Sequence, residues 1–216
     1  MKNRILFAAA LLAAGTAAHL PASAQLGFIK NPLAAVTGGS SGSAAPANAG
    51  QVLRNTRDAL LAFTKSELGL TQAIGGYNEY AAQQNLLDGM KTGDAAASKD
   101  ELEQIIVIHK QAAAHIEKMV AENAALDASN KKLAGKSMLE YVKGVAYTRK
   151  MVASVQDLAK NPMSLGGEMG SALLLAKEMP PVATGAVTTT GKLVKYLTAN
   201  GVDMGDVNKA KDDMGK

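Results

Sequence analysis

The sequence predicts an all-α fold: an elongated antiparallel bundle of about four to five helices that follows a signal peptide and a flexible linker. From Gln51 onwards, apolar residues recur every three or four positions, the spacing of one helix face, without the two-residue alternation of strands. With three Phe, five Tyr and no Trp, the core must consist mainly of aliphatic side chains and alanine. We expect the bundle at residues 51–200 and a polar tail at 201–216.

Residues 1–24 have the pattern of a secretory signal peptide. Lys2 and Arg4 precede an uncharged stretch rich in Ala and Leu, from Ile5 to Ala18, and Ala22-Ser23-Ala24 offers the small-x-small site that a signal peptidase cuts. As a helix this stretch would span about 21 Å, less than the roughly 30 Å of a hydrocarbon core. We therefore expect cleavage after Ala24 and a periplasmic or secreted protein.

Residues 25–50 are expected to form a low-complexity linker. From residue 31 onwards the linker is dominated by Gly, Ala, Ser, Pro and Asn, which bury too little apolar surface to offset the entropy of ordering. Leu26, Phe28 and Ile29 precede this stretch and could dock on the helical body or on a partner.

The first helix is expected over residues 51–90. Its apolar positions share one face: Leu53, Leu60, Phe63, Leu70, Ile74, Tyr77 and Ala81. Glu67 interrupts this stripe. Gly75 and Gly76 each weaken a helix interior by up to ~1 kcal/mol relative to Ala, so we expect a bend there.

Two capping boxes mark the next two helix starts. Ser98-x-x-Glu101 opens a helix that Gly135 is expected to end, because glycine favours the residue after a helix. Ser137-x-x-Glu140 opens a third helix, which should end before Pro162.

The rest of the chain, residues 163–200, is expected to form two shorter helices joined at Pro180-Pro181. Short connections between all of these elements predict antiparallel neighbours in an up-and-down bundle. In the tail, Asp203 could cap a frayed helix.

The composition excludes several kinds of chemistry. Without cysteine the chain has no thiol nucleophile, no disulfide, no cysteine-based zinc or iron–sulfur site and no c-type haem attachment. Its 23 Lys and Arg residues against 19 Asp and Glu give a net charge of +4, which removal of Lys2 and Arg4 lowers by two. The remaining basic residues are scattered along the sequence, so we expect no nucleic-acid partner.

Two short motifs imitate known sites. Gly38-Gly39-Ser40-Ser41-Gly42 matches the G-x-S-x-G pattern of a hydrolase, but it lies in the linker, without the strand and helix that position the serine. Gly135-Lys136-Ser137 resembles the end of a phosphate-binding P-loop, but Asn130 stands where that motif needs its first glycine.

Two histidines lie beyond the leader. His109 falls on the apolar face of the second helix, and His115 lies about 120° further round, so a straight helix cannot bring both to one ion. His115 and Met119 at i and i+4 would be half of a soft-metal site. A hydrogen-bonded or partly exposed histidine is the alternative.

Asp100, Glu101 and Glu103 cluster in the first turn of the second helix, where negative charge interacts favourably with the helix dipole. A role in acid–base chemistry would require a pocket that shifts their pKa values. We therefore expect no catalytic residue, no cofactor-binding residue and no metal ligand, and no bound cofactor.

Residues 165–191 are the least ordinary segment. They combine Gly166-x-x-x-Gly170, an apolar run at Leu173–Ala176, Pro180-Pro181 and a Thr/Gly/Val stretch with very few charges. One interpretation is a tightly packed helical hairpin buried in the bundle. The other is a hairpin that becomes exposed and inserts into a membrane or another protein, because small-residue seams mediate helix association in hydrocarbon.

From these observations we expect an exported, non-enzymatic helical bundle that acts through protein–protein contacts in the bacterial cell envelope, as an accessory, adaptor or assembly component. The expected partner is an envelope protein, and the helix faces also allow a homo-oligomer. One alternative is a secreted membrane-active protein, similar in general plan to α-helical pore-forming toxins, that inserts the 165–191 hairpin. Another is a bundle that holds a small ligand or a metal between its helices.

Overall fold

The computed structural model describes residues 49–93, 95–160 and 165–214, and these residues form an all-α helical bundle, which confirms the predicted fold class. The predicted signal peptide, nearly all of the predicted linker and the motif at Gly38–Gly42 lie outside the described residues.

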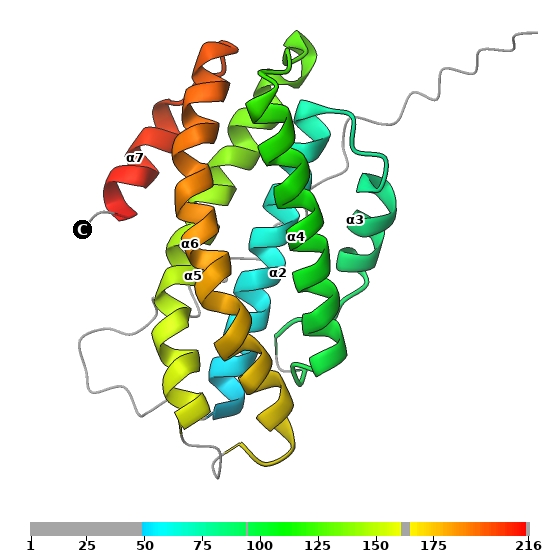
Figure 1. Cartoon of the computed structure of the whole chain (residues 1–216), viewed down its shortest axis with the longest axis vertical. Coiled ribbons are helices and arrows are strands. Elements are labelled where there is room, and N and C mark those ends of the chain that lie inside the picture. The colour runs from blue at the N-terminus through cyan, green and yellow to red at the C-terminus, as the bar shows by residue number, and fades with distance from the viewer. Residues whose placement is uncertain (1–48, 94, 161–164, 215–216) are drawn as a thin grey trace, which may run out of the picture. The chain divides into compact units, whose positions relative to one another are not determined.

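Six α-helices and two short 3-10 helices make up the described part (Figure 1). The α-helices are α2 (Ala49–Ile74), α3 (Tyr80–Asp88), α4 (Lys99–Ala121), α5 (Lys131–Lys160), α6 (Met169–Ala199) and α7 (Gly205–Met214). The 3-10 helix η1 (Ala128–Asn130) precedes α5, and η3 (Gly166–Glu168) precedes α6.

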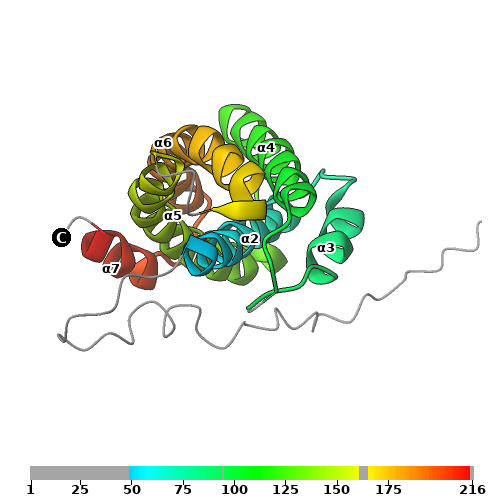
Figure 2. The same ribbon diagram turned by 90° about the horizontal axis from the view of Figure 1, so that it is seen from below.

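The four long helices pack around one core, with α2, α4 and α6 running in one direction and α5 in the other (Figure 1). Viewed along the bundle, α4 and α5 occupy opposite corners (Figure 2). The short connection between α5 and α6 predicted that these two helices are antiparallel neighbours, and the structure confirms it. The chain between α2 and α4 instead returns along the outside of the bundle through α3, so α2 and α4 are parallel.

Arg57 fixes this return path. Its side chain is only 1% exposed, and its guanidinium donates hydrogen bonds to the carbonyls of Ala95 (2.6 Å) and Gly93 (3.1 Å). Asp58 pairs with Arg57 at 2.8 Å, and its other oxygen accepts a bond from the amide of Gly93 at 3.0 Å. Two adjacent residues of α2 therefore hold the loop before α4 through its backbone.

The predicted bend at Gly75-Gly76 is a full break between α2 and α3. Both glycines adopt left-handed backbone angles, with φ of +88° and +72°, which residues with a side chain rarely adopt. The predicted first helix is thus two helices, and the second of them, α3, buries only Leu87.

The start of α4 is as predicted, because the Ser98 hydroxyl accepts a hydrogen bond from the Glu101 amide at 3.2 Å. The predicted end at Gly135 is wrong. Asn123 takes the left-handed conformation (φ +49°) and the Ala124 amide bonds back to the Met119 carbonyl, a glycine-type helix stop made with asparagine.

The predicted helix start at Ser137 is also wrong, because Gly135 and Ser137 both lie inside α5. The apolar face of α5 already begins at Ala134, and Ser137 is 1% exposed. A Cβ on Gly135 would lie 3.3 Å from the carbonyl oxygen of Asp203, so this glycine lets the C-terminal segment pass close to α5.

The predicted junction at Pro180-Pro181 is wrong as well: both prolines lie within the continuous helix α6. Proline removes a backbone hydrogen bond and normally breaks a helix. Here Met179, Val182 and Ala183 are buried on either side of the prolines, so core packing keeps the helix continuous.

The C-terminal segment is less detached than a polar tail. Val202, Met204 and Val207 are at most 6% exposed, and α7 packs against α5. Asp203 accepts a hydrogen bond from the Gly205 amide at 3.0 Å, close to the capping role predicted for it.

The seam between α2 and α5 is unusually close at two glycines. A Cβ on Gly144 would lie 2.8 Å from Cδ2 and 3.2 Å from Cα of Phe63. A Cβ on Gly69 would lie 2.5 Å from the Ser137 hydroxyl, which has no hydrogen-bond partner among the described residues.

We predict that Gly144→Ala lowers the free energy of unfolding by about 1–3 kcal/mol, because the added methyl group overpacks against the Phe63 backbone. Gly185→Ala is the matched control: this glycine is exposed on α6 with nothing within 4 Å of an added Cβ. It should stabilise the helix by up to ~1 kcal/mol. Urea denaturation measures both, and equal effects would contradict the close seam.

Candidate functional site

Two titratable side chains meet in the core, Glu67 on α2 and His109 on α4, which are 1% and 7% exposed. Nδ1 of His109 lies 2.6 Å from Oε2 of Glu67. The sequence marked Glu67 as an interruption of an apolar face and His109 as a member of another. The structure brings them together as one hydrogen-bonded pair.

An aromatic ring lies beside this pair, and a second ring lies beside the first. Phe63 lies 5.5 Å from the His109 ring and 5.1 Å from the Tyr141 ring, measured between centroids. The Tyr141 hydroxyl donates to the Ala186 carbonyl at 3.3 Å. This cluster therefore has members from all four long helices, α2, α4, α5 and α6.

Burial shifts the pKa values of all three titratable groups. It raises the pKa of Glu67 by more than the charge and hydrogen bond of His109 lower it. Burial opposes a charged His109, but the Glu67 carboxylate and its hydrogen bond outweigh this and raise the pKa of His109. Burial, followed by the charges of Glu67 and Glu117, raises the pKa of Tyr141. Glu67 and His109 together therefore keep a shared proton to higher pH than a free histidine does.

The Glu67–His109 pair is a structural tie between α2 and α4. Acid–base chemistry needs a substrate within hydrogen-bond reach of the proton that moves. Neither of the two surface grooves described below is lined by Glu67 or His109. Their contacts instead join two parallel helices in the middle of the bundle.

His115 ties the same two helices near their ends. Its Nε2 lies 2.8 Å from the Gly75 carbonyl, so this nitrogen carries the proton, and its ring lies 4.9 Å from that of Tyr77. His115 is thus hydrogen-bonded, which is one of the alternatives that the sequence left open for it. Met119 lies on the same side, since a Cβ on Gly76 would contact both residues. Among the described residues, no three His, Asp or Glu side chains gather as a metal ion would require.

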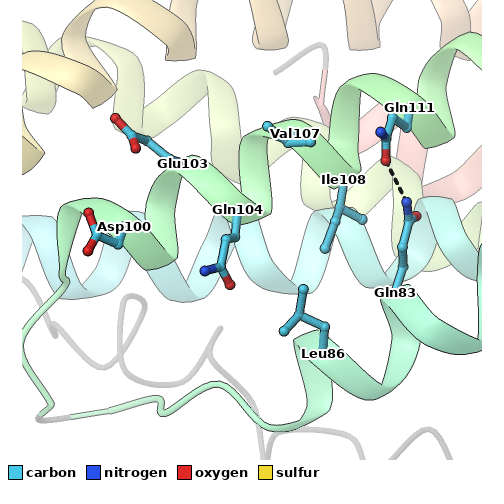
Figure 3. Close-up of a pocket in the computed structure, with 8 residues that line it drawn as sticks. All are labelled: Gln83, Leu86, Asp100, Glu103, Gln104, Val107, Ile108 and Gln111. Carbon is cyan, nitrogen blue, oxygen red and sulfur yellow. Dashed lines mark hydrogen bonds between the residues drawn. The ribbon is translucent and has the colours of Figure 1, made fainter.

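A groove of about 420 Å³ lies on the surface between α3 and α4 (Figure 3). Its apolar side chains are Leu86 and Val107, which are 47% and 51% exposed, with the buried Ile108 beneath them. Leu86 extends from α3 towards α4, and all of the other labelled residues except Gln83 come from α4 (Figure 3). We call this site the α3/α4 groove.

Polar side chains line the rest of the α3/α4 groove. Gln83 donates a hydrogen bond to Gln111 at one end, and Asp100 and Glu103 lie at the other (Figure 3). Glu103 makes an exposed ion pair with Lys99 at 3.1 Å. No ion pair of Asp100 is found in the described part of the chain. The first-turn carboxylates that the sequence singled out therefore give this groove an acidic end.

A second groove, of about 430 Å³, lies between α5 and α6. Arg149 and Val152 of α5 line it together with five residues of α6: Pro180, Ala183, Thr184, Val187 and Thr188. Part of the unusual segment 165–191 therefore lies at the surface. Because Met169–Ala199 is one continuous helix, the predicted hairpin is wrong, and no helix in the described ranges is both long and apolar enough to cross a bilayer.

Sequence reasoning missed both grooves. Leu86 and Leu87 are adjacent, as are Val107 and Ile108, and in each pair the first residue is exposed and the second buried. A helical pattern places both members near the apolar face. Only the position of α3 decides which of them contacts solvent.

Comparison with known proteins adds no relative: no family model, no curated protein and no solved structure matches this chain.

We predict that His109→Leu alone lowers the free energy of unfolding at neutral pH by about 3–5 kcal/mol, the usual cost of leaving one member of a buried pair without its partner. Combining it with Glu67→Leu removes the orphaned carboxylate and should recover most of that loss. Urea denaturation of the two single variants and the double variant gives the coupling. A double variant as unstable as His109→Leu would contradict the pair's role.

Stability should also depend on pH through this pair. The folded-state pKa of His109 lies above that of the unfolded chain, about 6.5, so its contribution is complete below that pH and is lost as the pH rises through the folded pKa. The raised pKa of Glu67 has the same sign. We expect the free energy of unfolding to fall as the pH rises above about 6.5 and through the folded-state pKa of His109. The Glu67→Leu/His109→Leu variant should lack this fall. An unchanged fall in that variant would show that the pair is not its cause.

Proposed function

We propose that the protein is an exported, non-enzymatic adaptor of the cell envelope that holds a segment of a partner protein in the α3/α4 groove. The observation that carries this proposal is that two half-exposed apolar side chains, Leu86 of α3 and Val107 of α4, line one groove with Ile108 between them (Figure 3). Elsewhere in the described part, large side chains of this kind at 40% exposure or more are found only on α6, at Met169, Leu173 and Val187.

The lining of the groove favours a basic, amphipathic helical segment as the occupant. Leu86 and Val107 would receive its apolar stripe, as in helix-in-groove recognition. Asp100 and Glu103 would face Lys or Arg residues beside that stripe, and the amides of Gln83 and Gln104 can donate or accept along its length. Displacing Lys99 from Glu103 costs little, because both side chains are about half exposed.

The position of the buried titratable groups supports a non-enzymatic role. The polar atoms of Glu67, His109 and Tyr141 make contacts between helices. Burial raises the pKa values of Glu67 and Tyr141, and the Glu67 carboxylate raises that of His109. Turnover of a generic esterase, peptidase or phosphatase substrate that one point substitution abolishes would overturn this part of the proposal.

We predict that a synthetic helical peptide with a leucine stripe flanked by lysines binds the purified protein about tenfold or more tightly than its glutamate counterpart, because of the acidic end of the groove. Fluorescence anisotropy measures both affinities. Leu86→Ser/Val107→Ser should abolish binding, since it removes the apolar contacts.

The matched control is Leu173→Ser/Val187→Ser, which removes two equally exposed apolar side chains from α6. It should bind the basic peptide as the unaltered protein does. Equal affinity for the two peptides, or equal loss in both variants, would contradict the α3/α4 groove as the docking site.

A further inference from the structure

Charge is unevenly divided between the two halves of the bundle. Together α5 and α6 contain ten Lys and Arg residues but only three acidic ones, whereas α2, α3 and α4 contain six basic and seven acidic residues. The low net charge of the whole chain therefore conceals a strongly basic pair of neighbouring helices.

The three acidic residues of α5 and α6 are each held in an ion pair. Glu140 pairs with Lys143 at 2.9 Å, Asp157 with Lys160 at 2.9 Å, and Glu178 with Lys110 of α4 at 2.7 Å. Among the basic residues, Arg149, Lys150, Lys192 and Lys195 are exposed and have no acidic partner in the described part of the chain. Their charge is free to act on something outside the molecule.

An apolar stripe follows α6 through this basic region. Leu173, Pro180, Val187 and Val194 are spaced seven residues apart and so share one face, and Pro180 and Val187 line the groove beside α5. Leu173 is 51% exposed and Val187 45%. Buried helix faces favour such side chains, but here they contact solvent.

Basic residues flank the stripe at matching positions. Lys177 lies two helical turns before Thr184, and Lys195 lies two turns after Thr188. Because both threonines line the groove, the two lysines lie on the same side of α6 as the groove. Arg149 lines the same groove from α5. We call this surface the α5/α6 face; it comprises Arg149, Lys150, Leu173, Lys177, Val187 and Lys195.

We propose that the α5/α6 face binds the surface of an anionic membrane without inserting a helix into it. An apolar stripe with Lys and Arg beside it is the pattern of proteins that lie at a lipid interface. Four or more clustered basic residues suffice for electrostatic binding to anionic lipids. The α5/α6 face and the α3/α4 groove lie on different helices, so this inference does not depend on the proposed function.

Vesicle sedimentation tests the proposal. The protein is purified after export, its N-terminus is read by mass spectrometry, and it is mixed with vesicles of phosphatidylcholine alone or with added phosphatidylglycerol. We expect binding only to the anionic vesicles, and release as ionic strength rises. Equal binding to both compositions would overturn the proposal, and so would no binding to either.

Charge variants locate the binding face. Each basic residue near an anionic surface strengthens binding about fivefold, so Arg149→Gln/Lys195→Gln should weaken binding about 25-fold. Lys91→Gln/Lys118→Gln makes the same change in net charge at exposed positions outside α5 and α6 and should leave binding nearly unchanged. Circular dichroism confirms that each variant is folded. Equal weakening in both variants would refute the α5/α6 face.

Two further outcomes separate the proposal from its competitors. Dye-loaded anionic vesicles should stay intact when the protein binds, whereas dye release would favour insertion and overturn surface binding. If an acidic helical peptide binds at Arg149 and Lys195 while anionic vesicles do not, the face is a protein-binding surface and the membrane proposal fails.

Discussion

The parallel packing of α2 against α4 is the constraint on which the rest of this structure depends. Two parallel neighbours need a connection that returns along the whole bundle, and α3 with its flanking loops provides it. Three polar ties hold the two helices in register: Arg57 to the loop before α4, Glu67 to His109, and His115 to the Gly75 carbonyl. The α3/α4 groove exists because α3 lies outside this seam.

Much of the fold could be predicted from local signals. The Ser98 cap, the break at Gly75-Gly76 and the all-α class follow from the chemistry of neighbouring residues, which does not depend on distant contacts. The boundaries predicted at Gly135 and Pro180-Pro181 are wrong because contacts between distant residues decide the structure there. At both places a residue that normally ends a helix lies beside buried apolar side chains, and packing in the core outweighs the local preference.

The candidate sites were harder to predict because they join residues far apart in the sequence. Glu67 and His109 are 42 positions apart, and each looks like an imperfection in its own helix. Their pairing follows from the direction of α4 relative to α2, which the up-and-down expectation had reversed. Exposure of Leu86 and Val107 likewise depends on where α3 lies, and no periodicity within α3 or α4 contains that information.

Association of the chain with itself, through its two surface features, is one simple explanation to consider. The α3/α4 groove has an acidic end and the α5/α6 face is basic, so their charges are complementary. However, both surfaces are hollowed, and two rigid hollows cannot fill each other, whereas the fluid lipids of a membrane can follow a hollow. Two such surfaces on copies of one rigid bundle would leave their apolar side chains, Val107 and Val187 among them, in contact with water. Separate occupants for the two surfaces therefore account better for this distribution of charge and apolar exposure.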